Sequence, residues 1–442
     1  TVLTRLARWA ASQPDKPCYT FCDAKMRVSR SLTYAQLDGV TAALAARLVA
    51  PKESSGGKGG KGGKGGGYAL SRGDRVLLVY PPSLDFIAAY LACLRAGLVA
   101  VPVFPPIPGQ LKKDLHHFAS IHGSSGARFA LTNTTYNHAK RLVQLKEKFS
   151  TGKVRWPEDI RWIITDKDLT VDAKSASVAP AAVPPAAATP EGTVTAAAGG
   201  TDDAGGFARD SLAFLQYTSG STSEPKGVMI SHGNLAHNLS TIVAALGADQ
   251  NTSCVAWLPQ YHDMGLIGSY LGTLYCGGSG YYMSPISFVK RPVMWVEMMS
   301  KYKATHTQAP NFAYKLAARK FHAMPEAKRP RGLDLSTLQH MFNAAEPVTM
   351  DAIADFEAAF CPVGLPRGVI VPGYGLAEHT VYVCDRGRQR VRVNKRVLLE
   401  EHRAEVLEVF SDQSCGLNGD AAEGKEGTGK GEGGGGGGGG GG

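Results

Sequence analysis

Residues 75–104 read RVLLVYPPSLDFIAAYLACLRAGLVAVPVF, and this stretch decides the fold class. The apolar run Arg75–Tyr80 predicts a buried strand that ends at a Pro-Pro pair. Leu84–Ala96 predicts a helix with Gly97 as its C-terminal cap. Val99–Phe104 predicts a second strand. A strand, a helix and a strand within about thirty residues form a βαβ unit, which favours a parallel sheet in an α/β fold.

The same alternation continues on both sides of this unit. Strands are expected at Ala127–Leu131 and Arg161–Thr165, with a helix at Asn137–Phe149 between them. At the N-terminus, a second helix is expected at Ala35–Val49, and a first helix is expected from the apolar positions Leu3, Leu6, Ala7 and Ala10.

Low-complexity segments account for the high count of 53 glycines. Gly56–Gly67 reads GGKGGKGGKGGG, which predicts a flexible insertion. An Ala/Pro-rich linker at 171–209 and a Gly-rich tail at 411–442 lack a periodic apolar face, so we expect both to be disordered. The remaining sequence has the composition of an ordinary globular protein.

Charge and cysteine content narrow the function classes. A net charge of +10 suits anionic ligands such as nucleotides or an acidic partner, but the sequence has no basic stripe with interleaved aromatics, so no nucleic acid is expected. The 8 cysteines form no CxxC pair, which indicates reduced thiols and a cytoplasmic protein. No apolar run is long enough to predict a transmembrane segment. Because the chain begins at Thr1 rather than Met, organelle targeting stays open.

A hydroxyl-rich loop follows the short apolar strand Leu212–Leu215. Residues 216–227 read QYTSGSTSEPKG, and six small or hydroxylated residues in a row can turn backbone N–H groups toward one anion. Lys226 adds a mobile positive charge. The string is not a Walker loop, because a Pro precedes the Lys and a Gly follows it. Taken alone, its composition also suits a Ser/Thr/Gly surface loop.

TSGSTSEPKG resembles the signature loop of the acyl-activating, adenylate-forming superfamily. Three later segments resemble further signatures of that family in the same order: WLPQYHDMGLI at 257–267, NAAEP at 343–347 and GYGLAEHT at 373–380. The HDMGL form, together with Gly73–Ile87 and Val101–Pro106, resembles the fatty acyl-AMP ligase branch. The family joins a carboxylate to AMP from ATP, releases pyrophosphate and passes the acyl group to a thiol or another acceptor.

The resemblance implies a role for each motif residue. It assigns Lys226, Glu378 and His262 to catalysis, with Glu378 also holding Mg²⁺ on the phosphates of the substrate ATP. It assigns nucleotide binding to Thr218, Ser219, Gly220, Ser221, Thr222, Ser223, Gly227, Asn343, Ala344, Ala345, Glu346, Gly373, Tyr374, Gly375, Leu376, Ala377 and Thr380. Tyr374 would stack on adenine. Ala344 stands where the family usually has Gly.

His262 has two interpretations. A His-Asp pair alone suggests a general base or a metal ligand, but a carboxylate is already ionised at neutral pH and needs no base. His262 would therefore shape the carboxylate end of an acyl pocket, unless it is a hydrogen-bonded buried histidine without a direct role. The apolar segment Leu266–Leu274 contains Gly268 and Gly272 and would form the wall of an acyl tunnel.

The family fold implies a large N-terminal domain built from two mostly parallel α/β subdomains. We expect the first at 1–55 and 68–170, and the second at 210–385 with the ATP/AMP and acyl site. The Arg-rich stretch 386–410 resembles the start of an extra insertion of the branch. No TGD segment and no small C-terminal domain with its lysine is found, so we expect that domain to be missing.

Three functions compete at this stage. The first is a ligase that makes fatty acyl-adenylates for an acyl carrier protein or a polyketide synthase. The second is a long-chain acyl-CoA synthetase of the same fold. The third is a non-catalytic module that binds ATP and an acyl group.

Overall fold

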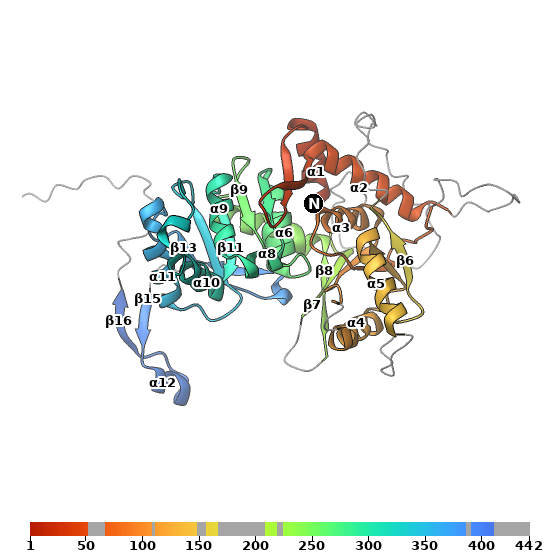
Figure 1. Ribbon diagram of the computed structural model, residues 1–442. Helices are drawn as coiled ribbons and strands as arrows, with labels where there is room; N and C mark the ends of the chain where they lie inside the picture. The colour runs from red at the N-terminus through yellow and green to blue at the C-terminus, as the bar shows by residue number, and fades with distance from the viewer. Residues whose placement is uncertain are drawn as a thin grey trace, which may run out of the picture. The chain divides into compact units, whose positions relative to one another are not determined.

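A computed structural model describes residues 1–51, 67–107, 111–147, 156–166, 208–218, 224–385 and 390–410 (Figure 1). The chain forms two compact units, Thr1–Arg388 and Gln389–Gly442. Most of Gly56–Gly67, nearly all of 171–209 and all of 411–442 lie outside the described residues, so the disorder expected there stays a prediction. Within the described ranges, no helix is long and apolar enough to cross a membrane.

The first sheet has six strands and is mostly parallel. Its order is β6 (Arg161–Ile164), β5 (Phe129–Thr132), β3 (Arg75–Leu78), β4 (Val99–Pro102), β7 (Leu212–Thr218) and β8 (Lys226–Ser231). Only the pairing of β7 with β8 is antiparallel among these strands.

The second sheet has eight strands and is parallel except at its two edges. Its order is β14 (Tyr382–Asp385), β13 (Ile370–Gly375), β12 (His340–Ala344), β11 (His306–Pro310), β9 (Ser253–Ala256), β10 (Ser279–Tyr282), β1 (Pro17–Cys22) and β2 (Val28–Thr33). The predicted α/β class with mostly parallel sheets is confirmed.

Each sheet takes strands from both stretches that the sequence assigned to separate subdomains. β1 and β2, expected with the first subdomain, complete the eight-stranded sheet, and β7 and β8, expected with the second, complete the six-stranded sheet. The unpaired backbone groups at a sheet edge can pair with any strand of suitable direction. Closeness along the chain therefore does not decide which sheet a strand joins. The two sheets are therefore interleaved within one unit.

Helix α3 (Leu84–Ala96) links the two sheets. It contacts β3 and β4 of one sheet and β1 of the other, and every residue from Phe86 to Leu94 is buried. A helix that is apolar on all sides is stable only when it is covered on all sides. The helix and its cap follow the sequence prediction, with Gly97 left-handed at φ 70°.

The faces of the six-stranded sheet belong to two different cores. Val76 and Leu78 of β3 join the large core that includes α3, whereas Leu77 and Val79 join a second core with Phe118 of α4 (Leu111–Ser125). This alternation follows the period of two of a strand. The sheet is covered on both faces, as expected for parallel strands.

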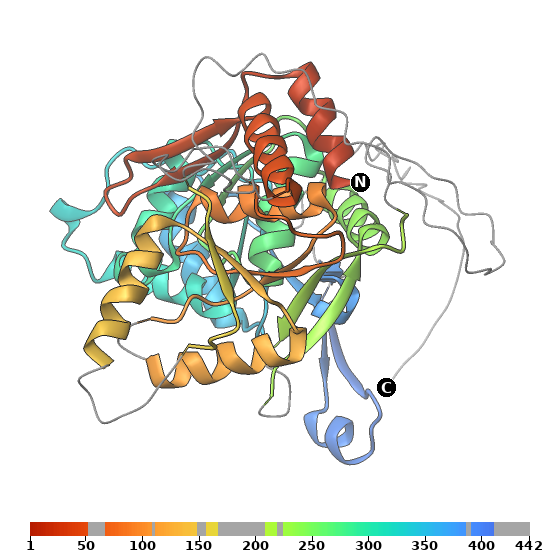
Figure 2. The same ribbon diagram turned by 90° about the vertical axis from the view of Figure 1, so that its right-hand side faces the viewer.

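Further α-helices surround the strands of the first unit (Figure 2). They are α1 (Val2–Ser12), α2 (Tyr34–Val49), α5 (Thr134–Glu147), α6 (His232–Leu246), α7 (Gly272–Cys276), α8 (Pro285–Lys290), α9 (Val293–Lys301), α10 (Asn311–His322) and α11 (Met350–Phe360). A π-helix, η2, spans Met264–Leu271, and short 3₁₀ turns are η3 (Glu326–Lys328), η4 (Cys361–Val363) and η5 (Ala377–His379).

Helix α1 corrects one detail of the sequence prediction. Its buried residues are Val2, Leu6 and Trp9, while Ala7 is exposed. Large side chains at i, i+4 and i+7 define the core face and outweigh the small alanines. The sequence prediction also missed β1, β2 and α4, because none of them shows a clean apolar period.

The second unit contains β15 (Arg390–Val393), α12 (Lys395–Glu400) and β16 (Val406–Phe410). The two strands pair antiparallel, and Arg392 opposes Glu408 with an N–O distance of 2.8 Å. The predicted extra insertion at 386–410 falls largely on this unit and stays a prediction.

Candidate functional site

The β7–β8 hairpin holds both ends of the predicted phosphate loop. Thr218 ends β7 and lies opposite Lys226, which begins β8 with an exposed side chain. Gly227 leaves room for the Tyr217 ring, since an added Cβ would lie 2.8 Å from that ring. The residues predicted to bind phosphate between these ends, Ser219, Gly220, Ser221, Thr222 and Ser223, lie outside the described residues.

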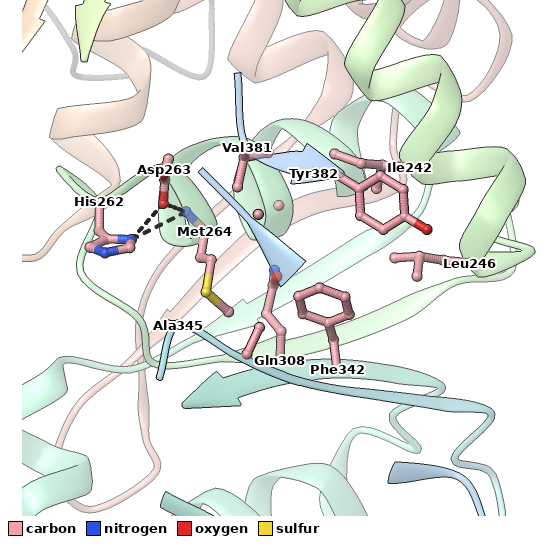
Figure 3. A pocket seen from close by; sticks show the side chains of 13 residues that line it. Ile242, Leu246, His262, Asp263, Met264, Gln308, Phe342, Ala345, Val381 and Tyr382 are labelled. Carbon is pink, nitrogen blue, oxygen red and sulfur yellow. Dashed lines mark hydrogen bonds and ion pairs between the residues drawn. The ribbon is translucent and has the colours of Figure 1, made fainter. Parts of the chain in front are cut away.

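A pocket of about 200 Å³ opens beside the eight-stranded sheet (Figure 3). Its wall combines side chains of α6, the π-helix η2 and strands β11 to β14. The lining residues are Ile242, Leu246, His262, Asp263, Met264, Gly268, Gln308, Phe342, Ala344, Ala345, Gly375, Val381 and Tyr382. Most of these side chains are apolar, with a few polar groups among them, which is the usual composition of a small-molecule site.

His262 and Asp263 form the polar rim of this pocket. The His262 Nδ1 lies 2.7 Å from Asp263 Oδ1, and the Met264 N–H donates to the same oxygen at 2.6 Å (Figure 3). Partial burial of the imidazole lowers the pKa of His262, but the hydrogen bond and the charge of Asp263 outweigh it, so this pKa lies above its ordinary value. The His262 side chain is 52% exposed and can therefore reach a ligand.

The segment that carries His262 is fixed from the six-stranded sheet. Gln216 of β7 donates from Nε2 to the Tyr261 carbonyl at 3.0 Å. Gln260 exchanges two hydrogen bonds with the Ser83 backbone, at 2.9 and 2.8 Å. Gln216 stands only two residues before Thr218, so a single side chain connects the base of the phosphate loop to the rim of the pocket.

The NAAEP segment divides between the two faces of β12. Asn343 is fully buried and donates from Nδ2 to Asn311 Oδ1 at 3.0 Å, on the face away from the pocket. Ala344 and Ala345 line the pocket, and Ala345 has a φ of 70°. Glu346 accepts from the Phe312 N–H at the start of α10, at 2.5 Å. The Asn343 and Glu346 side chains therefore support this wall, and the two alanines form it.

The GYGLAEHT segment brings β13 and β14 to the pocket. Gly375 lines it, and no side chain is tolerated there because an added Cβ would lie 1.9 Å from the Val381 carbonyl oxygen. Tyr374 and Glu378 are exposed. Thr380 is buried with a φ of 71°, which is unfavourable for a β-branched residue. Such strain is often found beside functional sites.

The remaining predicted residues of this segment take supporting positions. Gly373 packs its backbone against the Phe342 ring, since an added Cβ would lie 2.0 Å from that ring. Leu376 is half-buried before the η5 turn, and Ala377 is buried within it.

The structure thus brings three of the four motif segments to one pocket. The predicted residues that line it are His262, Ala344, Ala345 and Gly375. The sequence prediction missed Ile242, Leu246, Gln308, Phe342, Val381 and Tyr382. No local pattern distinguishes these side chains from core residues, although Phe342, Val381 and Tyr382 lie within two residues of a recognised motif.

The donor set fits a magnesium ion only together with a substrate. Among the described residues, no group of three or more His, Cys, Asp or Glu side chains gathers as a metal site. Mg²⁺ commonly binds through one or two carboxylates plus substrate phosphates and water. Glu378 offers one such carboxylate, which is exposed and does not line the pocket.

Residues 68–407 match the sequence pattern of a known family, described as AMP-binding enzyme. The chain belongs to the AMP-binding enzyme family. The match covers most of the chain and includes all four motif segments. The family predicted from the motifs is therefore confirmed.

Two relatives are similar to the chain over most of its length. It is 35% identical over 398 residues to the medium-chain fatty acid acyl-carrier-protein ligase JamA of Moorena producens, covering 89% of this chain and 58% of JamA. It is 31% identical over 391 residues to the long-chain fatty acid AMP ligase FadD32 of Mycolicibacterium smegmatis, covering 87% of this chain and 53% of FadD32. The chain spans little more than half the length of these relatives.

A solved structure supports the same branch of the family. The fatty acyl-adenylate ligase of L. pneumophila, in complex with acyl adenylate and pyrophosphate, superimposes with a TM-score of 0.69 at 31% identity. The match covers 93% of this chain and 62% of that one. The resemblance to fatty acyl-AMP ligases is confirmed.

Proposed function

We propose that the chain activates a fatty acid as its acyl-adenylate, using ATP and releasing pyrophosphate. The supporting observation is the largely apolar pocket onto which three separately predicted motif segments converge. The apolar side chains that α6 and η2 contribute to this pocket suit an acyl chain, because its methylenes are bound by burial away from water.

In this proposal the residues of the chain bind and orient the two reactants. Lys226 and the loop before it hold the phosphates of ATP, and Ala344, Ala345 and Gly375 allow the nucleotide to approach the backbone closely. Mg²⁺ held by Glu378 would supply positive charge to the phosphates when bound.

The fatty acid carboxylate would lie at the rim formed by His262 and Asp263. It is already ionised near neutral pH, so its oxygen attacks the α-phosphorus without a general base. His262 attracts it when the ring is charged, and Asp263 raises the pKa of this ring, so that the charged form extends to higher pH. Holding the carboxylate in line with the α-phosphate removes much of the entropic cost of the reaction.

The proposal also includes the acceptor of the acyl group and the cellular location of the protein. JamA is by name an acyl-carrier-protein ligase, and this supports a carrier protein or a polyketide synthase as the acceptor. The cysteines within the described residues are free thiols, which supports a cytoplasmic location.

The test measures pyrophosphate release by the chain with ATP, Mg²⁺ and a fatty acid, and identifies the acyl-adenylate by mass spectrometry. Adding either a carrier protein with its phosphopantetheine arm or coenzyme A then identifies the acceptor. Formation of the acyl-CoA would favour the synthetase alternative. Nucleotide binding without pyrophosphate release would favour the non-catalytic alternative.

A further inference from the structure

Helix α4 lies beside the end of the β7–β8 hairpin that carries the predicted phosphate loop (Figures 1 and 2). In both views the orange helix runs up to the yellow-green strands. Ser120 and Ser124 stand four residues apart on this helix. Residues at that spacing lie one turn apart on the same face. One face of α4 therefore offers two hydroxyl groups to the hairpin.

Ser120 holds the hairpin on the side of β8. Its hydroxyl donates a hydrogen bond to the Glu224 carboxylate. Glu224 stands two residues before Lys226, which begins β8. A hydrogen bond to an ionised acceptor is stronger than one between neutral groups. The contact therefore fixes the chain just before the predicted phosphate-binding lysine.

Ser124 holds the hairpin on the side of β7. The Tyr217 hydroxyl donates to Ser124 Oγ at 3.1 Å. Tyr217 pairs with Gly227 in the strand register, and its ring fills the space where a side chain of residue 227 would lie, since an added Cβ would be 2.8 Å from the ring. The Tyr217 side chain thus passes over β8 next to Lys226 and ends on α4.

The opposite side of α4 is fixed in the core. Leu115, Phe118 and Ile121 are buried in the second core, together with residues of the six-stranded sheet. The Phe118 ring stacks on Trp162 of β6, with 6.3 Å between the ring centroids and an angle of 15°. Moving the helix would expose these side chains to water, which is unfavourable. A helix fixed in this way can determine where the hairpin end lies.

We propose that α4 positions the end of the hairpin for ATP, with Ser120 and Ser124 as positioning residues. They act through Glu224 and Tyr217, which flank Lys226. This inference rests on the proposed function, in which Lys226 binds the phosphates of ATP. Holding a binding group in place before the ligand arrives removes part of the entropic cost of binding. We assign to the hairpin end the two phosphates that ATP has and AMP lacks, so α4 should increase the affinity for ATP and not that for AMP.

The test removes the two contacts and then restores one of them. Ser120→Ala combined with Ser124→Ala removes both hydroxyls. Ser120→Asp instead sets two carboxylates against each other. Glu224→Gln, added to Ser120→Asp, supplies an amide that can donate to the new carboxylate and restores the original net charge. Ser29→Ala is the matched control, because it removes a hydrogen bond of 2.9 Å from an exposed serine to the Phe21 carbonyl outside the site.

The measurements are the equilibrium affinities for ATP with Mg²⁺ and for AMP, and the melting temperature. The double alanine variant should bind ATP about three- to tenfold more weakly and AMP with unchanged affinity, because two surface hydrogen bonds contribute modestly. Ser120→Asp should weaken ATP binding at least as much, and adding Glu224→Gln should recover most of the loss. Ser29→Ala should change neither affinity.

The outcomes separate this inference from the proposed function. If every variant binds ATP as well as the unchanged chain does, the inference alone is overturned. Equal weakening of ATP and AMP, together with a lower melting temperature, would show that α4 only stabilises the fold and would also overturn it. The same holds if adding Glu224→Gln recovers no affinity. If the unchanged chain binds neither nucleotide, the proposed function itself is wrong, and the inference falls with it.

Discussion

The β7–β8 hairpin end and the pocket beside the eight-stranded sheet are built in different ways. The hairpin end presents an exposed lysine, and the loop that it carries is rich in Gly, Ser and Thr. The pocket is built from anchored side chains that are mostly buried and come from six separate elements. In the proposed function, the hairpin end would bind phosphate mainly through backbone groups and one charge, whereas the pocket would bind an acyl chain by its shape.

The difference shows where specificity can vary. A phosphate loop has to satisfy the same anion in every relative, so its sequence is constrained over consecutive residues. A pocket wall has to exclude water and match a length, which many combinations of apolar side chains achieve. We therefore expect changes at the hairpin end to lower the rate with every fatty acid, and changes in the pocket to alter the choice among fatty acids.

Lys226→Ala tests the hairpin end and carries the largest expected effect. Loss of one charge-assisted hydrogen bond to phosphate should lower adenylate formation about 10- to 150-fold, equally for all chain lengths. Pyrophosphate release is the measurement, and Lys320→Ala, an exposed lysine of α10, is the control. If Lys226→Ala leaves the activity unchanged, Lys226 does not bind the phosphates.

Glu378→Gln tests whether the phosphate side depends on a metal. Removing one carboxylate charge while nearly keeping shape should raise the Mg²⁺ concentration for half-maximal rate on the order of tenfold. The KM for fatty acid should change little. Equal changes in the two quantities would contradict a metal role and indicate a structural one.

Gln216→Met tests the single side chain that joins the two regions. It leaves the Tyr261 carbonyl without its donor and loosens the segment that carries His262, so kcat should fall about two- to tenfold. Gln13→Met removes a comparable bond from a side chain to the Gly277 carbonyl, at 2.8 Å, outside the site. If the two variants lose the same amount of stability and neither loses kcat, Gln216 has no positioning role.

His262→Gln tests the polar rim of the pocket through its pH dependence. The folded pKa lies above the ordinary value, so the ring stays charged to higher pH and loses its charge as pH rises through that folded pKa. The fatty acid KM should therefore rise about two- to threefold above neutral pH, since an exposed ion pair contributes little. The KM of the variant should not change with pH. If its pH profile is identical to that of the unchanged chain, His262 does not bind the fatty acid carboxylate.

The sequence predicts an element accurately where its apolar pattern and its capping residue indicate the same boundaries. Leu84–Ala96 was predicted to the residue because an apolar run ends at a glycine that only a left-handed cap explains. Three of the four motif segments meet at one pocket, but the position of Asn343 on the far face of β12 required the register of the strand. Phe342 and Tyr382 were missed because a pocket-lining aromatic residue has the same sequence pattern as a core one.

The parallel pairing of β1 with β10 has a consequence for synthesis on the ribosome. β1 can pair with β2 as soon as both are made, but its parallel partner β10 follows only about 260 residues later. At roughly 5–20 residues per second, one edge of β1 waits about 13–50 s before it can pair. During that interval Tyr19 and its neighbours lie in an incomplete sheet that invites association with other chains. Production of this protein should therefore depend on chaperone supply more than its final stability suggests.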